Sequence, residues 1–232
     1  KNGETIESVL NRAIGELTGE EIHVMGSSRT DAGVHACGNV AVFDTEARMA
    51  ADKFSYALNQ RLPEDIRIQD SCEVPADFHP RFQKTVKTYE YRILNREFPL
   101  PAYRFNSHFT YRKLDVERMR QAAAYLIGEH DFQSFCAAGA QVKTTVRTIY
   151  ALDVEKQGDL IILRITGNGF LYNMVRIIAG TLMKIGQGDW EPERMPEILA
   201  GCDRQLAGPT APARGLTLME IHFKGKSCYE RK

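Results

Sequence analysis

The stretch TYEYRIL, residues 88–94, carries the alternation of side chains that decides the fold of this chain. Successive side chains of a β-strand point to opposite faces of the sheet, so Tyr89 and Tyr91 share one face. Glu90 and Arg92 share the other. Strand tyrosines commonly pack in a core, whereas aromatic rings interleaved with lysine and arginine can stack RNA bases while the cations hold phosphates. The sequence leaves both interpretations open.

The elements that follow this strand complete a ferredoxin-like unit. Apolar residues at helical spacing predict two main helices, and alternating apolar residues predict three more strands. The resulting order is strand, helix, strand, strand, helix, strand. A loop rich in glycine and proline, AGPTAPARGL, precedes the last strand. The predicted ranges are strands 88–94, 146–155, 160–166 and 217–223, main helices 115–128 and 171–186, and a short helix near 192–200.

The first part of the chain shows the same order with its first strand missing. Its predicted elements are helix 5–18, strands 21–25 and 39–43, helix 49–62 and strand 66–69. The predicted fold class is therefore α+β, with two ferredoxin-like halves joined through a largely antiparallel central sheet and a cleft between them. Because Pro75 and Pro80 interrupt the pattern, we expect the halves to comprise residues 1–80 and 81–232.

Composition indicates a globular chain with an uneven distribution of charge. The 232 residues are 43% hydrophobic and carry 30 basic and 30 acidic side chains. Basic residues concentrate in three segments, 81–96, 164–184 and 224–232, which form either one basic face or separate solvated surfaces. No apolar run approaches the length of a membrane span and no leader pattern begins the chain, so we expect a cytoplasmic protein without membrane contact.

Cysteine and histidine spacing gives no sign of a metal site. The five cysteines are scattered without a Cys-x-x-Cys pair, and no two histidines have the spacing of a helical ligand pair. We expect neither a disulfide framework nor a bound metal. We expect His35, His79 and His130 to be structural.

The stretch SSRTDAGVHA, residues 27–36, places Arg29 and Asp31 two positions apart among small residues. On these residues alone, Asp31 is more often a turn former, since Asp-Ala-Gly favours an Asx-type turn. A loop that joins two strands on a rigid scaffold, however, often holds functional groups. Asp31 is therefore a candidate for either role.

Arg176 is the anomaly of the apolar stretch FLYNMVRIIAGTLMKIG, residues 170–186. An unpaired buried charge costs several kcal/mol, so this arginine either reaches solvent or meets a carboxylate. The helix itself offers none. A carboxylate from elsewhere in the fold, such as Asp31, is a suitable partner.

Six stretches together resemble the tRNA pseudouridine synthase A family. The resemblance covers nearly the whole chain, and two of the stretches are long enough to make joint chance occurrence improbable. Members of that family usually begin with a strand carrying Tyr-Asp-Gly, and this chain starts just after it, in agreement with the missing first strand. The stretches are SSRTDAGVHA, FHPRFQKTVKTYEYRI, GEHDFQSFCAAG, TVRTIY, GNGFLYNMVRIIAGTLMKIG and AGPTAPARGLTL.

The resemblance implies a role for each candidate residue. Asp31 becomes the catalytic nucleophile, paired with Arg176. Arg29 helps to displace and hold the target nucleotide, and Tyr89 packs against the uracil. The resemblance also implies a homodimer whose RNA spans both subunits, with residues 1–80 carrying the catalytic loop and 81–232 completing the RNA-binding cleft. The implied substrate-binding residues are Leu216, which lines the pocket, and Arg81, Phe170 and Asn173.

The implied reaction is isomerisation of uridine to pseudouridine in the tRNA anticodon stem-loop, at positions 38–40. It breaks the C1′–N1 glycosidic bond, turns the uracil and rejoins it through C5, and needs no cofactor. An adjacent arginine favours the ionised carboxylate that this chemistry requires. The uridine must leave its stack to reach Asp31. Whether Asp31 attacks C1′, attacks the base or abstracts a sugar proton stays open.

Two other classes of function compete with this one. A non-catalytic RNA-binding module of two ferredoxin-like units predicts that Asp31→Asn leaves function intact. A glycoside hydrolase also breaks a C1′ bond but normally needs two carboxylates, for which Asp131 is the available second acid.

Overall fold

The computed structural model describes residues 3–140 and 142–223, and the basic segment 224–232 lies outside the described residues. The chain forms two compact units. Within the described residues, the first contains 3–29 and 39–83, and the second contains 30–38 and 84–223. Residues 30–38, which include Asp31, therefore belong with the second unit, whereas Arg29 belongs with the first.

The first unit packs two helices over a small apolar core. Helix α1 (Ile6–Thr18) begins with a capping box between Thr5 and Ser8 and ends at Gly19, whose φ of 76° suits the left-handed C-cap. Helix α2 (Phe54–Asn59) follows the 3₁₀ turn Ala51–Lys53, and strands β1 (Met25–Gly26) and β3 (Ala41–Val42) pair antiparallel. The core residues are Val9, Leu10, Ala13, Ile14, Ile22, Val24, Phe54, Leu58 and Leu62.

Residues 66–69, predicted as a strand, have no strand structure. The backbone N–H and C=O of Ile68 both bond to the side-chain amide of Asn59, at 2.8 Å each. Ile66 and Ile68 still pack against the apolar core, which explains the alternation in the sequence. A side chain of α2 thus takes the hydrogen bonds that a neighbouring strand would have taken.

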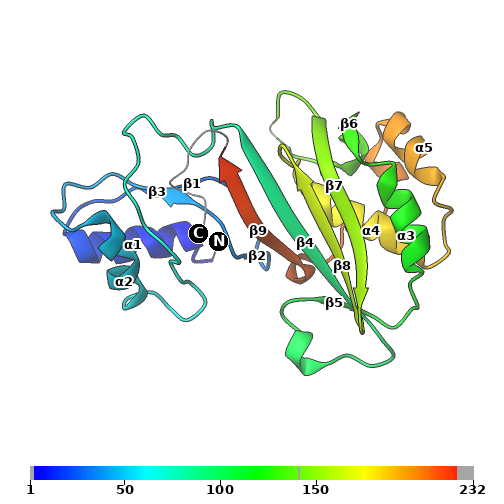
Figure 1. Cartoon of the computed structure of the whole chain (residues 1–232), viewed down its shortest axis with the longest axis horizontal. Coiled ribbons are helices and arrows are strands. Elements are labelled where there is room, and N and C mark those ends of the chain that lie inside the picture. The colour runs from blue at the N-terminus through cyan, green and yellow to red at the C-terminus, as the bar shows by residue number, and fades with distance from the viewer. Residues whose placement is uncertain (1–2, 141, 224–232) are drawn as a thin grey trace. The chain divides into compact units, whose positions relative to one another are not determined.

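The second unit is built on a seven-stranded, mostly antiparallel sheet (Figure 1). The strand order is β2-β9-β4-β8-β7-β6, and β5 pairs with the end of β4. Only the β2–β9 and β4–β5 pairs are parallel. The strands are β2 (His35–Ala36), β4 (Thr85–Asn95), β5 (His108–Thr110), β6 (Gly128–Asp131), β7 (Val146–Gln157), β8 (Leu160–Gly167) and β9 (Leu216–Phe223).

Helices α3 (Val116–Ala124) and α4 (Met174–Gly186) pack against each other and against this sheet (Figure 1), and α5 (Arg194–Gly201) follows α4. Tyr91 of β4 and its cross-strand partner Leu163 are buried on one face of the sheet. On the opposite face, Glu90 forms ion pairs with Arg92 and Arg164. The predicted alternation along β4 is confirmed.

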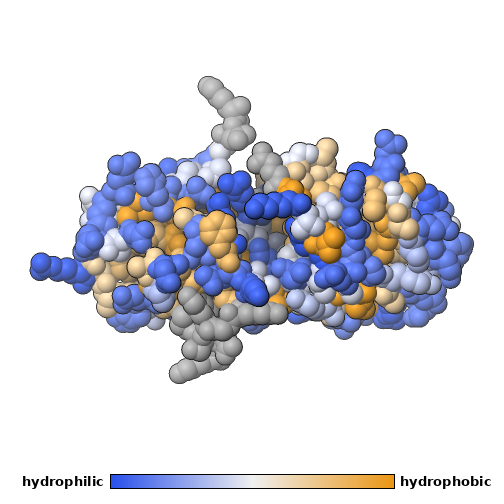
Figure 2. Space-filling view, turned by 90° about the horizontal axis from the view of Figure 1, so that it is seen from above, coloured by the Kyte–Doolittle hydropathy of each residue, from blue (hydrophilic) through white to orange (hydrophobic). Residues whose placement is uncertain are grey.

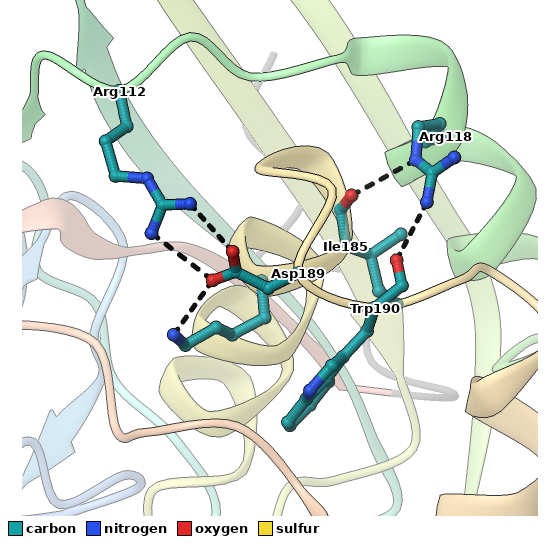
Figure 3. A network of polar contacts seen from close by, with 6 residues as sticks. Arg112, Arg118, Ile185, Asp189 and Trp190 are labelled. Carbon is teal, nitrogen blue, oxygen red and sulfur yellow. Dashed lines mark hydrogen bonds and ion pairs between the residues drawn. The ribbon is translucent and has the colours of Figure 1, made fainter.

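The C-terminal end of α4 is tied to the segment before α3 (Figure 3). Asp189 accepts hydrogen bonds from Arg112 at 2.7 and 3.3 Å and from Lys184 at 3.0 Å. Arg118 donates to the carbonyl of Ile185 at 3.3 Å and to that of Trp190 at 2.9 Å. These contacts fix where α4 ends.

The surface is mixed in character. Figure 2 shows one face on which hydrophilic side chains predominate, with apolar side chains in small groups between them. Across the described part of the chain, no helix combines the length and the apolar character needed to cross a bilayer.

The strand order and the helices of the second unit together make an α+β arrangement around an open, mostly antiparallel sheet.

Candidate active site

Asp31 begins a tight turn that is anchored to the sheet. The N–H of Val34 donates to the carbonyl of Asp31 at 3.0 Å, and Gly33 adopts a φ of 81°, a value that favours glycine at the third position of such a turn. After the turn, β2 pairs with β9, and Cys37 donates to the carbonyl of Leu218 at 2.8 Å. The backbone of Asp31 thus forms a turn, which leaves its side chain for another contact.

The side chain of Asp31 forms an ion pair with Arg176. The Nη1 atom of Arg176 lies 3.0 Å from Oδ2 of Asp31, and the arginine side chain is only 16% exposed. The Asp31 side chain is 35% exposed. Its other oxygen, Oδ1, accepts no hydrogen bond from the described residues. The carboxylate that the sequence suggested for Arg176 is therefore present, and one of its oxygens stays available.

Two further acceptors hold the guanidinium of Arg176 in place. Its Nη1 atom also donates to Oδ1 of Asn173 at 2.7 Å, and its Nε atom donates to the carbonyl of Ala211 at 2.7 Å. Asn173 is the N-cap residue of α4 and has a φ of 59°. This left-handed residue delays the start of the helix to Met174, three residues later than the sequence predicts. The delay places the Asn173 amide beside the guanidinium.

The loop that supplies the Ala211 carbonyl is packed tightly on α4. Ala211 donates to the carbonyl of Arg176 at 3.1 Å, and Gly208 donates to the hydroxyl of Thr181 at 2.9 Å. A Cβ atom at Gly180 would lie 1.8 Å from the carbonyl oxygen of Pro209. Only glycine permits this approach of loop to helix. The loop is thus fixed along two turns of α4.

Tyr91 anchors the next part of the same loop. Its ring is completely buried, and its hydroxyl donates to the carbonyl of Pro212 at 2.9 Å. Burial raises the pKa of Tyr91 well above its ordinary value, although nearby Arg176 and Arg214 act in the opposite direction. Tyr91 therefore stays protonated as the donor. Leu216, a predicted pocket residue, lies opposite Tyr91 on β9 and is 7% exposed.

Tyr89 lies on the same face of β4 as Tyr91 and contacts Phe170. Its ring packs edge-on against that of Phe170, with ring centres 5.2 Å apart and an interplanar angle of 86°. Tyr89 is 8% exposed, and Phe170 is half-buried. A Cβ atom at Gly167 would be 3.3 Å from the Phe170 ring. The second unit therefore contains an aromatic pair as well as the charged pair.

The predicted site residues thus divide between the two units. Six of them lie in the second unit, where Asp31 and Asn173 each accept a hydrogen bond from Arg176. The six are Asp31, Asn173, Arg176, Tyr89, Phe170 and Leu216. Arg29 and Arg81 lie in the first unit and are exposed. Arg81 donates through Nε to the carbonyl of Gly26 at 2.9 Å.

Asp131, the second acid that a glycoside hydrolase would need, and two of the histidines make local contacts. Asp131 lies on β6 and accepts a hydrogen bond from the backbone of Gln133 at 3.0 Å, at the start of a 3₁₀ turn. His35 contacts the carbonyl of Phe105, and His130 contacts that of Ile127. Residues 3–140 and 142–223 contain no group of three or more side chains suited to a metal.

Comparison with known proteins identifies the family. A family model described as tRNA pseudouridine synthase matches residues 1–83 and 122–224. The chain belongs to the tRNA pseudouridine synthase family. Its enzyme class, an isomerase acting on tRNA, agrees with the expectation from the sequence.

The relatives of this enzyme match it over almost their whole length. A tRNA pseudouridine synthase A of Brevibacillus brevis is 50% identical over 220 residues, which cover 94% of this chain and 90% of the relative. Proteins of the same name from Ruminiclostridium cellulolyticum and Acetivibrio thermocellus are 48% and 46% identical, and each alignment covers 96% of this chain and 91% of the relative.

Sequence reasoning missed the backbone acceptors of the site. The carbonyl groups of Ala211 and Pro212 accept hydrogen bonds from Arg176 and Tyr91. Every residue has a backbone carbonyl, so the residue type does not show which carbonyl acts as an acceptor. The signal that was available is the loop AGPTAPARGL itself, whose glycines and prolines indicate a special backbone path. Tyr91 could have been found from its place two residues after Tyr89 on the same strand face.

Proposed function

We propose that this enzyme converts uridine to pseudouridine in the anticodon stem-loop of tRNA, at positions 38–40, with Asp31 as its nucleophile. The observation that carries the proposal is the half-exposed carboxylate of Asp31, held through one oxygen by a nearly buried arginine. A carboxylate can act as a nucleophile, and the guanidinium holds this one in place through its Oδ2 atom. The unengaged Oδ1 atom is the one available to the substrate.

The reaction balances without any co-reactant. The C1′–N1 bond of uridine breaks, the uracil turns within the site, and C1′ joins C5. The hydrogen of C5 leaves as a proton, and N1 gains a proton. Whether the carboxylate attacks C1′, attacks the base or takes a sugar proton, the detached uracil has to be retained in the site.

Apolar and aromatic side chains suit the retention of the uracil. We assign the packing against the base to Tyr89, whose ring is backed by Phe170, and the lining of the pocket to Leu216. Exclusion of water by these groups would protect a reactive sugar from hydrolysis. Asn173 keeps Arg176 oriented toward the carboxylate.

The target uridine reaches Asp31 by leaving its stack. Extrusion of a base costs a few kcal/mol, which cationic contacts to the RNA backbone offset. We assign displacement of the nucleotide to Arg29 and a phosphate contact to Arg81, because both are exposed cations on the stretches shared with the family.

The same proposal includes the architecture and the setting of the enzyme. We propose two ferredoxin-like halves in the sequence, 1–80 and 81–232, in which the first half supplies the catalytic loop, packed in the second unit, and the second half completes the RNA-binding cleft. The order β9-β4-β8-β7 supports this for the second half. The family resemblance supports a homodimer that acts on tRNA in the cytoplasm.

Release of tritium from C5-labelled uridine in unmodified tRNA tests the proposal. We expect the enzyme to release tritium from intact tRNA but not from a transcript whose anticodon stem-loop uridines are replaced by cytidine. Equal release from both transcripts would contradict the assignment of the target. Free uracil in place of pseudouridine would indicate a hydrolase, and tRNA binding without release would indicate the non-catalytic module.

A further inference from the structure

The turn His79–Pro80–Arg81–Phe82 of the first unit displays an aromatic ring to solvent. Phe82 is 82% exposed, more than any other large apolar side chain among the described residues. Its inner face stacks on the His79 imidazole, with ring centres 3.9 Å apart and an angle of 20°. We refer to these two rings as the His79–Phe82 platform. One face of the phenyl ring is thus supported and the other is open.

The backbone of this turn is strongly constrained. The N–H of Phe82 donates to the carbonyl of His79 at 3.1 Å, with Pro80 at the position of the turn that its fixed φ suits. The N–H of Arg81 donates to Nδ1 of His79 at 3.2 Å, which orients the imidazole ring. Each of these contacts reduces the freedom of the platform before any ligand binds.

Two contacts attach the turn to the segment that leads into the stretch 27–36. The hydroxyl of Ser27 donates to the carbonyl of Pro80 at 3.1 Å, and Nε of Arg81 donates to the carbonyl of Gly26 at 2.9 Å. Ser27 itself donates to the carbonyl of Val40 at 2.7 Å. The platform is therefore held on the strands of the first unit.

The charge beside the platform indicates the kind of ligand. Arg81 is exposed, and no acidic side chain of the described residues pairs with it. An open aromatic face next to an unpaired guanidinium matches a nucleotide, whose base stacks and whose phosphate is anionic. We propose that the His79–Phe82 platform stacks an unpaired base of the bound tRNA while Arg81 contacts a phosphate. This inference rests on the proposed function, since it takes tRNA as the ligand.

Substitution at Phe82 separates stacking from mere apolar contact. We expect Phe82→Ala and Phe82→Leu each to weaken tRNA binding about ten-fold, and Phe82→Trp to bind like the parent, because stacking needs a ring. The rate of tritium release at saturating tRNA and the thermal midpoint should not change. Binding by Phe82→Leu as tight as that of the parent would contradict the proposal.

A salt titration distinguishes the platform from its neighbouring cation. We expect Phe82→Ala to lower affinity equally at all salt concentrations. Arg81→Ala should make the slope of log affinity against log salt shallower by about 0.7–0.9, the value for one phosphate contact. A slope unchanged by Arg81→Ala would overturn the phosphate contact.

A fluorescent reporter tests for stacking itself. The chain has a single tryptophan, Trp190. The double variant Phe82→Trp, Trp190→Phe should lose fluorescence on titration with tRNA, whereas Tyr56→Trp, Trp190→Phe, with a reporter at another exposed position, should not. Equal quenching at both positions would contradict a specific stacking site.

The outcomes also separate this inference from the proposed function. If the parent binds tRNA but releases no tritium from it, the proposed function fails. The binding and fluorescence measurements then still test whether the platform stacks a base. If the parent is active and the Phe82 variants bind normally, the platform alone fails. A change in molecular mass of Phe82→Ala by sedimentation would assign Phe82 to a protein contact and overturn the RNA contact.

Discussion

The two ends of helix α4 both bring an arginine to a carboxylate, but they leave the carboxylate in different states. At the C-terminal end, Asp189 uses both oxygens, accepting from Arg112 and Lys184 (Figure 3). At the N-terminal end, Asp31 accepts from Arg176 through Oδ2 alone. The first contact ties segments together, and the second leaves an oxygen for chemistry.

The comparison shows that an arginine–carboxylate pair is not by itself a sign of an active site. The distinguishing features are the free oxygen of Asp31 and the three separate acceptors that orient Arg176. A guanidinium fixed by several acceptors is preorganised and does not need to rearrange during a reaction. The following substitutions test this difference between the two ends.

Apart from loss of the Asp31 carboxylate itself, the largest effect is expected from Arg176→Ala. Its loss leaves Asp31, Asn173 and the Ala211 carbonyl without their common donor. We expect pseudouridine formation to fall about 100-fold or more, and the free energy of unfolding to fall by about 2–3 kcal/mol. Single-turnover assays and urea denaturation measure the two effects. Arg112→Ala, at the other end of α4, is the matched control and should retain full activity.

Gly180→Ala should disturb the contacts at the N-terminal end of α4 by displacing the backbone of the loop that packs on the helix. The new Cβ atom would meet the Pro209 carbonyl at 1.8 Å, so the loop that holds Arg176 must move. We expect destabilisation of about 1–3 kcal/mol in urea denaturation, together with slower catalysis. Gly26→Ala is the control: its new Cβ atom would have no heavy atom within 4 Å, so this substitution should be nearly neutral. Equal effects of the two substitutions would contradict the role of this close approach.

Tyr91→Phe should have a smaller effect. It removes the hydroxyl that donates to the Pro212 carbonyl and leaves that acceptor without its partner. We expect a loss of about 1 kcal/mol in the free energy of unfolding. The exposed Tyr111 serves as the control, since Tyr111→Phe should change the free energy of unfolding by less than about 0.5 kcal/mol. A neutral Tyr91→Phe variant would show that this anchor is dispensable.

The smallest effect, and the one that depends on pH, is expected from Asp189→Asn. Hydrogen bonds from Arg112 and Lys184 lower the pKa of Asp189 to about 2. A carboxyl whose pKa is lower in the folded state stabilises the fold above its unfolded pKa, and this contribution is lost as the pH falls through the folded value. The difference in thermal midpoint between parent and variant should therefore close between about pH 4 and pH 2. A constant difference across that range would contradict the assignment.

The sequence predicted the four long strands and the two main helices of the second unit because their signals are local. It missed the short strands β2, β5 and β6, and it extended the helix of 115–128 past the end of α3 at Ala124. The alternation along TYEYRIL and the apolar spacing in 171–186 are patterns of neighbouring residues, and β4 and α4 form there. The strand expected at 66–69 does not form, because the same alternation also describes an extended segment packed on a core. Periodicity reports which side chains are buried, not where backbone hydrogen bonds go.

The charged pair was the part of the candidate site that the sequence made predictable. An arginine in an apolar helix requires a partner, which led from Arg176 to Asp31 over 145 residues of sequence separation. The Ala211 carbonyl and the approach of Pro209 to Gly180 depend on tertiary packing of the backbone. No residue type records such contacts in advance.

The most direct test of the account compares the two carboxylates in one assay. The experiment uses the parent, Asp31→Asn and Asp189→Asn, after binding and unfolding measurements have shown that all three are folded and bind tRNA equally. Tritium release from C5-labelled tRNA is then measured for each protein. Both substitutions remove one negative charge and keep the shape of the side chain. The account predicts no release by Asp31→Asn and release at the parental rate by Asp189→Asn. Release by Asp31→Asn at the parental rate would contradict the central claim.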